Sequence, residues 1–192
     1  MTMTSKKTKL STLGACLALA LTTGAISTVS HADINDEILA AQATKITLKQ
    51  AISIANKQAK GSLVSAEFDD DDSDAKAGGP VYEIEFSDGV NNYEVKVDAI
   101  TGQVVDLDVD RLDKGDVADY NVRKQAKISA MSVINAIEKQ ANSRVLEVEF
   151  KNNRNHADHP TYFEVDMLRG NQIIELKLDA TTGREFARKV KK

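Results

Sequence analysis

The chain has 192 residues, with 25 lysines and arginines against 29 aspartates and glutamates, so its formal net charge is −4. An acidic chain is repelled by the phosphates of nucleic acids and by anionic membrane surfaces, and we expect neither as a partner. The single cysteine, Cys16, excludes an intramolecular disulfide framework.

Residues 1–32 have the pattern of a cleavable signal peptide. Three lysines, Lys6, Lys7 and Lys9, precede an apolar stretch over residues 10–26, and the small-x-small sequence Ser30-His31-Ala32 follows it. The apolar stretch is too short and too poorly flanked for a stable membrane span. We predict cleavage between Ala32 and Asp33 and a periplasmic or secreted location for residues 33–192.

A lipid anchor on Cys16 is the competing interpretation of this segment, because residues 13–16 read LGAC. Only six residues separate Lys9 from Cys16, however, and the most apolar run follows the cysteine. A lipoprotein signal discards its apolar run, so the sequence favours the unmodified, cleaved form. That form has no cysteine and a net charge of −7, and it must be held together by packing alone.

The remaining chain contains one unit twice. Residues 46–68 align with 128–150 at a shift of 82, with seven of 23 positions identical, and residues 82–105 align with 163–186 at a shift of 81, with eight of 24 identical. We therefore divide the chain into a lead-in (33–45), a first repeat (46–108), a charged linker (109–127), a second repeat (128–188) and a basic tail (189–192). Two copies are too few for a solenoid.

Each repeat is predicted to be a helix followed by strands. Thr47 and Gln50 match a helix capping box, Gly61 is a natural helix stop, and Ser129 occupies the cap position of the second repeat. The apolar helical stripe of the first repeat is Leu48, Ala51, Ile52, Ala55 and Ala59.

The later segments alternate with a period of two, which indicates sheets with one wet face. Residues 82–86 and 93–97 place aromatic and aliphatic side chains on one face and mostly glutamates on the other. The predicted fold is α+β: two tandem repeats, each an amphipathic helix packed on a three- to four-stranded antiparallel sheet. Cores this small are thin, so we expect the two repeats to pack on each other or on a partner.

A turn motif is repeated as VDAITGQVV at residues 97–105 and LDATTGREF at 178–186. Glycine supplies the positive φ that such a turn needs, and aspartate bonds the nearby backbone. The motif is therefore first of all a hairpin.

With its flanking strands, this motif resembles the PepSY family. The first repeat matches the family pattern at Tyr93, Glu94, Val95, Val97, Asp98, Ala99, Thr101, Gly102 and Val104. The second matches at Glu175, Leu176, Leu178, Asp179, Ala180, Thr182 and Gly183, and departs from it at Ile174 and Glu185.

The resemblance implies a non-enzymatic protein that inhibits or modulates a peptidase, because PepSY domains occur in propeptides of thermolysin-like peptidases. A peptidase would have to be a separate protein partner. No catalytic residue is attributed to the family. We predict that the hairpin residues bind the partner: Asp98, Ala99, Ile100, Thr101 and Gly102, with Asp179, Ala180, Thr181, Thr182 and Gly183.

Two loops carry potential metal ligands. The acidic stretch with Asp69, Asp70, Asp71, Asp72 and Asp74 fails the EF-hand pattern from either starting point, because its sixth position is alanine. His156 and His159 lack the helix-borne zinc spacing and an adjacent third ligand. We read the first as a solvated loop and the second as surface histidines, and expect no cofactor.

Three functions remain open: modulation of a peptidase, which we favour; sensing of a divalent cation or small ligand; and a structural role in an envelope complex. Enzymatic activity is not expected, since the sequence has neither a G-x-S-x-G elbow nor a glycine-rich phosphate loop.

Overall fold

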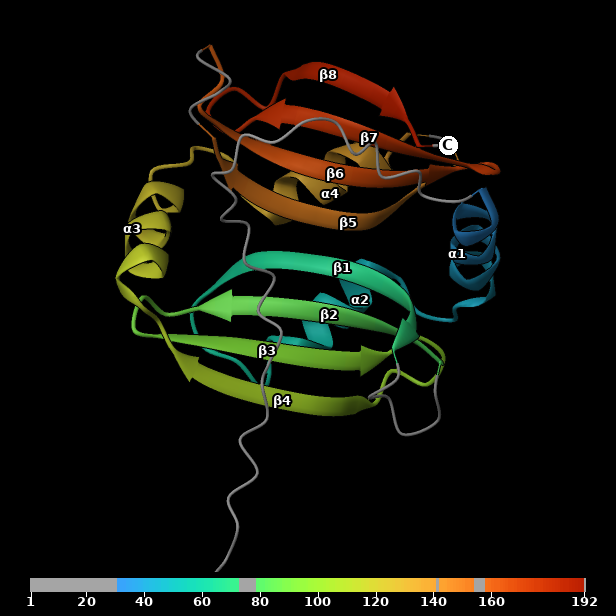
Figure 1. Ribbon diagram of the computed structural model, residues 1–192, viewed down its shortest axis with the longest axis horizontal. Helices are drawn as coiled ribbons and strands as arrows, with labels where there is room; N and C mark the ends of the chain where they lie inside the picture. Colours follow the sequence, from blue (N-terminus) through green and yellow to red (C-terminus); the bar gives the residue numbers. More distant parts are fainter. Residues whose placement is uncertain (1–30, 73–78, 141, 154–157, 192) are drawn as a thin grey trace, which may run out of the picture.

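The computed structural model describes residues 31–72, 79–140, 142–153 and 158–191 (Figure 1). The helices are α1 (His31–Ala43), α2 (Leu48–Ala55), α3 (Lys114–Arg123) and α4 (Ala130–Glu138). The strands are β1 (Ser62–Asp72), β2 (Gly79–Ser87), β3 (Asn91–Asp98), β4 (Val104–Arg111), β5 (Ser143–Asn152), β6 (Thr161–Arg169), β7 (Gln172–Asp179) and β8 (Glu185–Val190).

The strands form one eight-stranded sheet in the order β4-β3-β2-β1-β5-β6-β7-β8, and every adjacent pair is antiparallel. The predicted α+β class is confirmed, with four strands from each repeat. The two repeats meet edge to edge, so the two predicted sheets are halves of a single sheet.

Helices α2 and α4 cover one face of the sheet, which is the far face in Figure 1. The alternation of the strands decides this arrangement: Tyr82, Ile84 and Phe86 are buried on the helix side, whereas Glu83 and Glu85 alternate with them and are half-exposed. We call the uncovered side the open face. Helices α1 and α3 lie at opposite ends of the strands (Figure 1).

The capping box of α2 is confirmed. The Thr47 Oγ1 accepts the Gln50 N–H at 3.3 Å, and the Gln50 Oε1 accepts the Thr47 N–H at 2.8 Å. The equivalent Ser129 Oγ accepts the Ser132 N–H at 3.2 Å at the start of α4. These bonds satisfy backbone donors that the first helical turn leaves free, so both helices begin where the sequence predicts.

Gly61 lies beyond the end of α2, directly before β1, in the left-handed region at φ +96°. A Cβ atom at this position would lie 2.0 Å from the carbonyl oxygen of Ser87. The chain therefore needs glycine for both its backbone angle and its close approach to the end of β2.

The segments outside the repeats are ordered into helices. The 109–127 region, predicted as an exposed charged linker, contains the end of β4 and all of α3, and no residue of α3 is fully buried. The lead-in region forms most of α1, whose Ile34, Ile38 and Ala41 belong to the hydrophobic core. Both helices bridge the two halves of the molecule.

The junction between the halves, which we call the seam, is the pairing of β1 with β5. This pairing has only two residue pairs, Ser65 with Glu149 and Ala66 with Val148. So short a ladder supplies few backbone hydrogen bonds, and contacts at its ends must add to it.

Arg144, at the start of β5, supplies such contacts at the α1 end of the seam. Its guanidinium donates to the carbonyl oxygens of Ala41 at 2.8 Å and Ile46 at 2.6 Å, and also to the hydroxyls of Thr44 and Tyr82. A side chain of the second repeat thus binds α1, the approach to α2, and β2. The planar guanidinium can bind several acceptors at once because it carries five donors.

We expect Gly61→Ala to lower the free energy of unfolding by at least about 2 kcal/mol, because the methyl group meets backbone that cannot easily move. Urea denaturation measures the difference. Gly79→Ala is the matched control, since a Cβ there has no atom within 4 Å. Equal losses in the two variants would contradict the steric explanation.

Arg144→Ala should lower the free energy of unfolding by about 2–3 kcal/mol, because it leaves partly buried carbonyl groups without donors. Arg169→Ala, at an exposed arginine on β6, should stay within about 0.5 kcal/mol of the unsubstituted chain. Thermal or urea unfolding provides the measurement, and an Arg144→Ala value as small as that of the control would show that the seam does not depend on this side chain.

Candidate binding cleft

The repeated turn motif fixes the hairpin to the start of the neighbouring helix. The Asp98 Oδ1 accepts the N–H groups of Ile100 at 2.9 Å and Thr101 at 2.6 Å. The carbonyl oxygen of Ala99 accepts the N–H groups of Lys45 at 3.0 Å and Ile46 at 3.3 Å, immediately before α2. The turn therefore closes a hairpin and positions a helix N-terminus at the same time.

The second repeat uses the same contacts. The carbonyl oxygen of Ala180 accepts the N–H groups of Lys127 at 3.1 Å and Ile128 at 3.3 Å, immediately before the cap of α4. The Asp179 carboxylate bonds His159 Nδ1 at 3.0 Å and also accepts from Thr182, and these bonds lower the pKa of Asp179 to about 2. Packing of the fold thus accounts for the repetition of the motif.

The hairpin residues that we predicted to bind a partner are largely engaged within the protein. Ala99 and Ala180 are fully buried, and Gly102 and Gly183 have positive φ and lie against isoleucines of their own repeat. The side chain of Thr101 is exposed, as are those of Thr181 and Thr182, while Ile100 is half-exposed. Binding of a partner at these tips stays a prediction.

The two stretches that carry potential metal ligands do not form a cluster in the described part of the chain. No group of three or more His, Cys, Asp or Glu side chains there could hold a metal ion. Asp69, Asp70, Asp71 and Asp72 belong to strand β1, so their reading as a solvated loop is wrong, and Asp72 is buried with its Oδ2 2.9 Å from Lys96 Nζ. Asp74 and His156 lie outside the described residues.

His159 is part of the packing of the second repeat. Its ring stacks on Phe186 with centroids 4.1 Å apart, and its Nδ1 faces Asp179. The tip of β8 is thereby held to the loop before β6. This arrangement gives the histidine a structural partner on each side.

The open face carries the acidic side chains that the alternation predicts. Glu83 pairs with Lys96 across β2 and β3, and Glu164 pairs with Lys177 across β6 and β7. Near the seam the acids oppose one another: Glu147 lies across from Asp166, and burial, followed by the charge of Asp166, raises the pKa of Glu147 well above its ordinary value. Burial and the nearby Glu83 raise the pKa of Glu94 to about 7.

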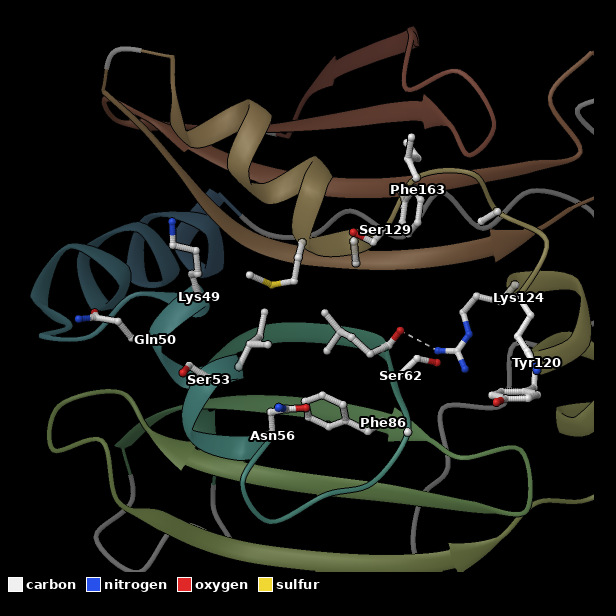
Figure 2. Close-up of a pocket in the computed structure, with 18 residues that line it drawn as sticks. Lys49, Gln50, Ser53, Asn56, Ser62, Phe86, Tyr120, Lys124, Ser129 and Phe163 are labelled. Carbon is white, nitrogen blue, oxygen red and sulfur yellow. Dashed lines mark hydrogen bonds between the residues drawn. The ribbon is translucent and has the colours of Figure 1, made fainter.

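A cleft lies on the opposite side, between α2 and α4 and over the seam (Figure 2). Its volume is about 940 Å³. It is lined by Lys49, Gln50, Ile52, Ser53, Asn56, Gly61, Ser62, Leu63, Phe86, Tyr120, Arg123, Lys124, Ala126, Ile128, Ser129, Ala130, Met131 and Phe163. Both repeats and the linker helix α3 therefore build it.

The cleft is apolar in its interior and cationic at its ends. Phe86 and Phe163 lie in the wall formed by the sheet, while Lys49 lies at one end and Lys124 with Tyr120 at the other (Figure 2). Among the described residues that line the cleft there are three cationic side chains and no carboxylate. In an acidic protein this surface has the charge opposite to that of the open face.

Arg123 is the most enclosed of these cations. Its guanidinium donates to the carbonyl oxygen of Leu63 at 2.8 Å and lies 5.4 Å from the centre of the Tyr120 ring. Burial lowers the pKa of Arg123 below its ordinary value. Lys49, in contrast, is exposed and lies 3.8 Å from a carboxylate oxygen of Glu138.

The described lining combines apolar side chains with a few hydroxyl groups. It contains serine hydroxyls at Ser53, Ser62 and Ser129, yet none of its described residues is a histidine or a carboxylate that could remove a proton from them. An apolar cleft with a few polar groups is typical of a binding site.

Sequence analysis missed this cleft. Tyr120, Arg123 and Lys124 fall in the region taken for a linker, and Phe86 and Phe163 appear only as members of alternating strands. The repeat itself was the available signal, since two equivalent helices on one sheet leave a groove between them when they do not pack directly together.

The first repeat is similar to a known protein family. Residues 45–108 match PepSY, the "Peptidase propeptide and YPEB domain". This confirms the family resemblance of the first repeat; the match does not extend to the second repeat. No curated protein gives a significant match.

Two solved structures are similar to the chain. One is a "putative lipoprotein" from Clostridium difficile 630, with 21% identity and a TM-score of 0.45, covering 81% of this chain and 99% of that one. The other is the YpeB C-terminal domain of Bacillus megaterium, with 18% identity and a TM-score of 0.30, covering 78% of this chain and 67% of that one. None of the described helices is long and apolar enough to span a membrane.

The raised pKa of Glu147 predicts a stability that depends on pH. The folded state holds this proton more tightly than the unfolded chain, so stability falls as the pH rises from the ordinary carboxyl value of 4.5 toward the raised one. Glu147→Gln should therefore increase the free energy of unfolding at pH 8 by about 1 kcal/mol and change it little at pH 4.5.

Urea denaturation across this pH range measures the effect. Glu164→Gln is the control on the same face, and it should be destabilising at pH 8 because Glu164 lies 2.7 Å from Lys177. A stability gain from Glu147→Gln that is equal at both pH values would contradict the assignment to titration.

Proposed function

We propose that this protein is an exported, non-enzymatic binding module that holds a segment of a protein partner in the cleft between α2 and α4. The cleft is the observation that carries the proposal: about 940 Å³ of largely apolar space, enclosed by both repeats. That size lies within the range of sites that bury a compact ligand, and suits a short stretch of peptide.

The PepSY match supports a peptidase as the partner, since the family is described by its occurrence in peptidase propeptides. We propose that the second repeat has the same origin and that both repeats together make the binding surface. A peptide in the cleft would place its apolar side chains against Phe86 and Phe163. A carboxylate of the same peptide would lie near Arg123 or Lys124. The chain would then modulate the peptidase rather than perform a reaction.

A steric substitution tests this role. Ser53 is exposed on α2 and lines the cleft, so Ser53→Trp should fill it without disturbing the core. Ala136→Trp, at an exposed position of α4 that does not line the cleft, is the matched control. The probe is a purified secreted peptidase of the thermolysin type, with its rate of peptide hydrolysis followed as the chain is added.

We expect the unsubstituted chain and Ala136→Trp to slow hydrolysis, and Ser53→Trp to weaken this effect by about tenfold or more. A third variant with Ile100 and Thr101 replaced by serine tests the hairpin tips: loss of the effect here, with retention in Ser53→Trp, would move the partner's site from the cleft to the hairpins. No change in hydrolysis with the unsubstituted chain would contradict modulation of this peptidase class.

The N-terminal pattern predicts the processed form. After expression in an exporting bacterium, the intact mass should correspond to residues 33–192, and Cys16→Ser should leave both mass and location unchanged. Mass spectrometry of the periplasmic fraction makes the measurement. A lipid-modified product that begins at Cys16 would overturn cleavage at Ala32.

A further inference from the structure

Within the described residues, the two outer strands of the sheet each have one edge to which no strand is paired, and the two edges carry opposite charge. The sheet ends at β4 on one side and at β8 on the other, and each pairs with a single neighbour (Figure 1). Strand β4 presents Asp106, Asp108 and Asp110 along the open face. The β8 edge carries Lys189 and Arg188, and Arg188 pairs with Glu185 of the same strand at 2.7 Å. The strand continues into Lys191, which pairs with Asp166.

Both edges also expose apolar side chains on the helix side. On β4, Leu107 is 41% exposed and Val109 50%, and on β8 Val190 is 39% exposed. Leu107 pairs with Val95 and Val109 with Tyr93, both buried, so these side chains continue the hydrophobic face of the sheet beyond the cover of α2. Such an edge is a template for another strand unless something prevents pairing.

Charge prevents each edge from pairing with its own copy. Two β4 edges would bring rows of aspartates together, and two β8 edges that pair Val190 with Arg188 would place Lys189 opposite Lys189. Like charges directly opposite one another are destabilising. Pairing of β4 with β8 of another copy brings opposite charges together, which is favourable. This selection follows from the charge pattern and does not involve the cleft or a peptidase.

On both edges, the backbone N–H and C=O groups that point outward belong to residues that can pair with one another. The Leu112 N–H donates to Val90 at 2.9 Å, so Leu112 points toward β3, and by alternation the backbone groups of Leu107 and Val109 point outward. The Lys191 N–H donates to Ile173 at 2.9 Å, so the backbone groups of Val190 point outward from β8. In both strands the outward-pointing residues are those with helix-side side chains.

We propose that copies of this chain associate head to tail, with β4 of one copy adding antiparallel to β8 of the next. One register satisfies charge, apolar contact and backbone phase together: Asp108 opposite Lys189, and Leu107 opposite Val190. Asp106 then lies opposite Lys191 on the same face. The antiparallel order of the sheet continues across the junction, so each added copy leaves another β4 edge free and the assembly is open-ended.

The test uses the exported chain after its mature mass has been determined. Sedimentation velocity over a concentration series should show an average mass that rises beyond that of a dimer and falls when salt is added. Asp106→Lys with Asp108→Lys blocks the β4 edge. Lys189→Glu with Val190→Pro blocks the β8 edge, and the proline removes only an outward N–H. Asp36→Lys with Asp71→Lys, at exposed positions away from both edges, controls for net charge.

Each edge variant alone should associate about tenfold or more weakly than the unsubstituted chain and the charge control. An equimolar mixture of the two edge variants should form a discrete dimer, because each retains the native edge that the other has lost. A circular dichroism melt checks that each variant is folded. If either edge variant unfolds, the milder substitutions Asp108→Asn on β4 and Lys189→Gln on β8 take the place of the edge variants.

Three results would overturn the proposal: an unsubstituted chain that stays monomeric at every soluble concentration, association that stops at a dimer, or a mixture of edge variants that does not dimerise. The hydrolysis assay of the cleft is independent of these outcomes, since Ser53→Trp changes neither edge.

Discussion

The short pairing between β1 and β5 is the constraint on which the rest of the structure depends. Two residue pairs cannot join two four-stranded sheets firmly. Lys49 of α2 adds contacts to Asn135 and Glu138 of α4, and further contacts are made at the ends of the seam. Arg144 binds α1 and the approach to α2 at one end, and Arg123 of α3 binds the carbonyl oxygen of Leu63 at the other. The helices outside the repeats thus complete the junction between them.

This junction also decides the surfaces of the molecule. Because the repeats meet strand to strand, α2 and α4 lie side by side on one face with an apolar cleft between them, and the acidic sides of both sheets merge into one open face. Like charges meet across the strands there, as at Glu147 and Asp166, and burial makes the protonated form more favourable. An apolar cleft with cationic ends and an acidic open face thus follow from a single edge-to-edge contact.

The repeated turn motif has a structural role in both halves of the molecule. Asp98 and Asp179 close the turns, and the carbonyl groups of Ala99 and Ala180 hold the chain just before each helix cap. The motif brings together two elements that are far apart in the sequence, the helix start and the final hairpin. Its residues are therefore engaged in the packing of each repeat.

The sequence by itself determined the local elements. Thr47 and Ser129 start helices because their hydroxyls satisfy backbone donors, and alternation over residues 82–97 and 163–178 sets which side of the sheet is dry. These signals depend on neighbours a few residues away, which is why the repeats and their α+β class could be predicted.

Only the tertiary structure decided how the repeats meet and what lies between them. The hydrogen bond from Arg123 to Leu63 joins residues 60 positions apart, and the one from Arg144 to Ala41 joins residues 103 positions apart. No local period encodes such distances, and a charged segment that reads as a linker becomes a wall of the site once α3 packs across the end of the seam.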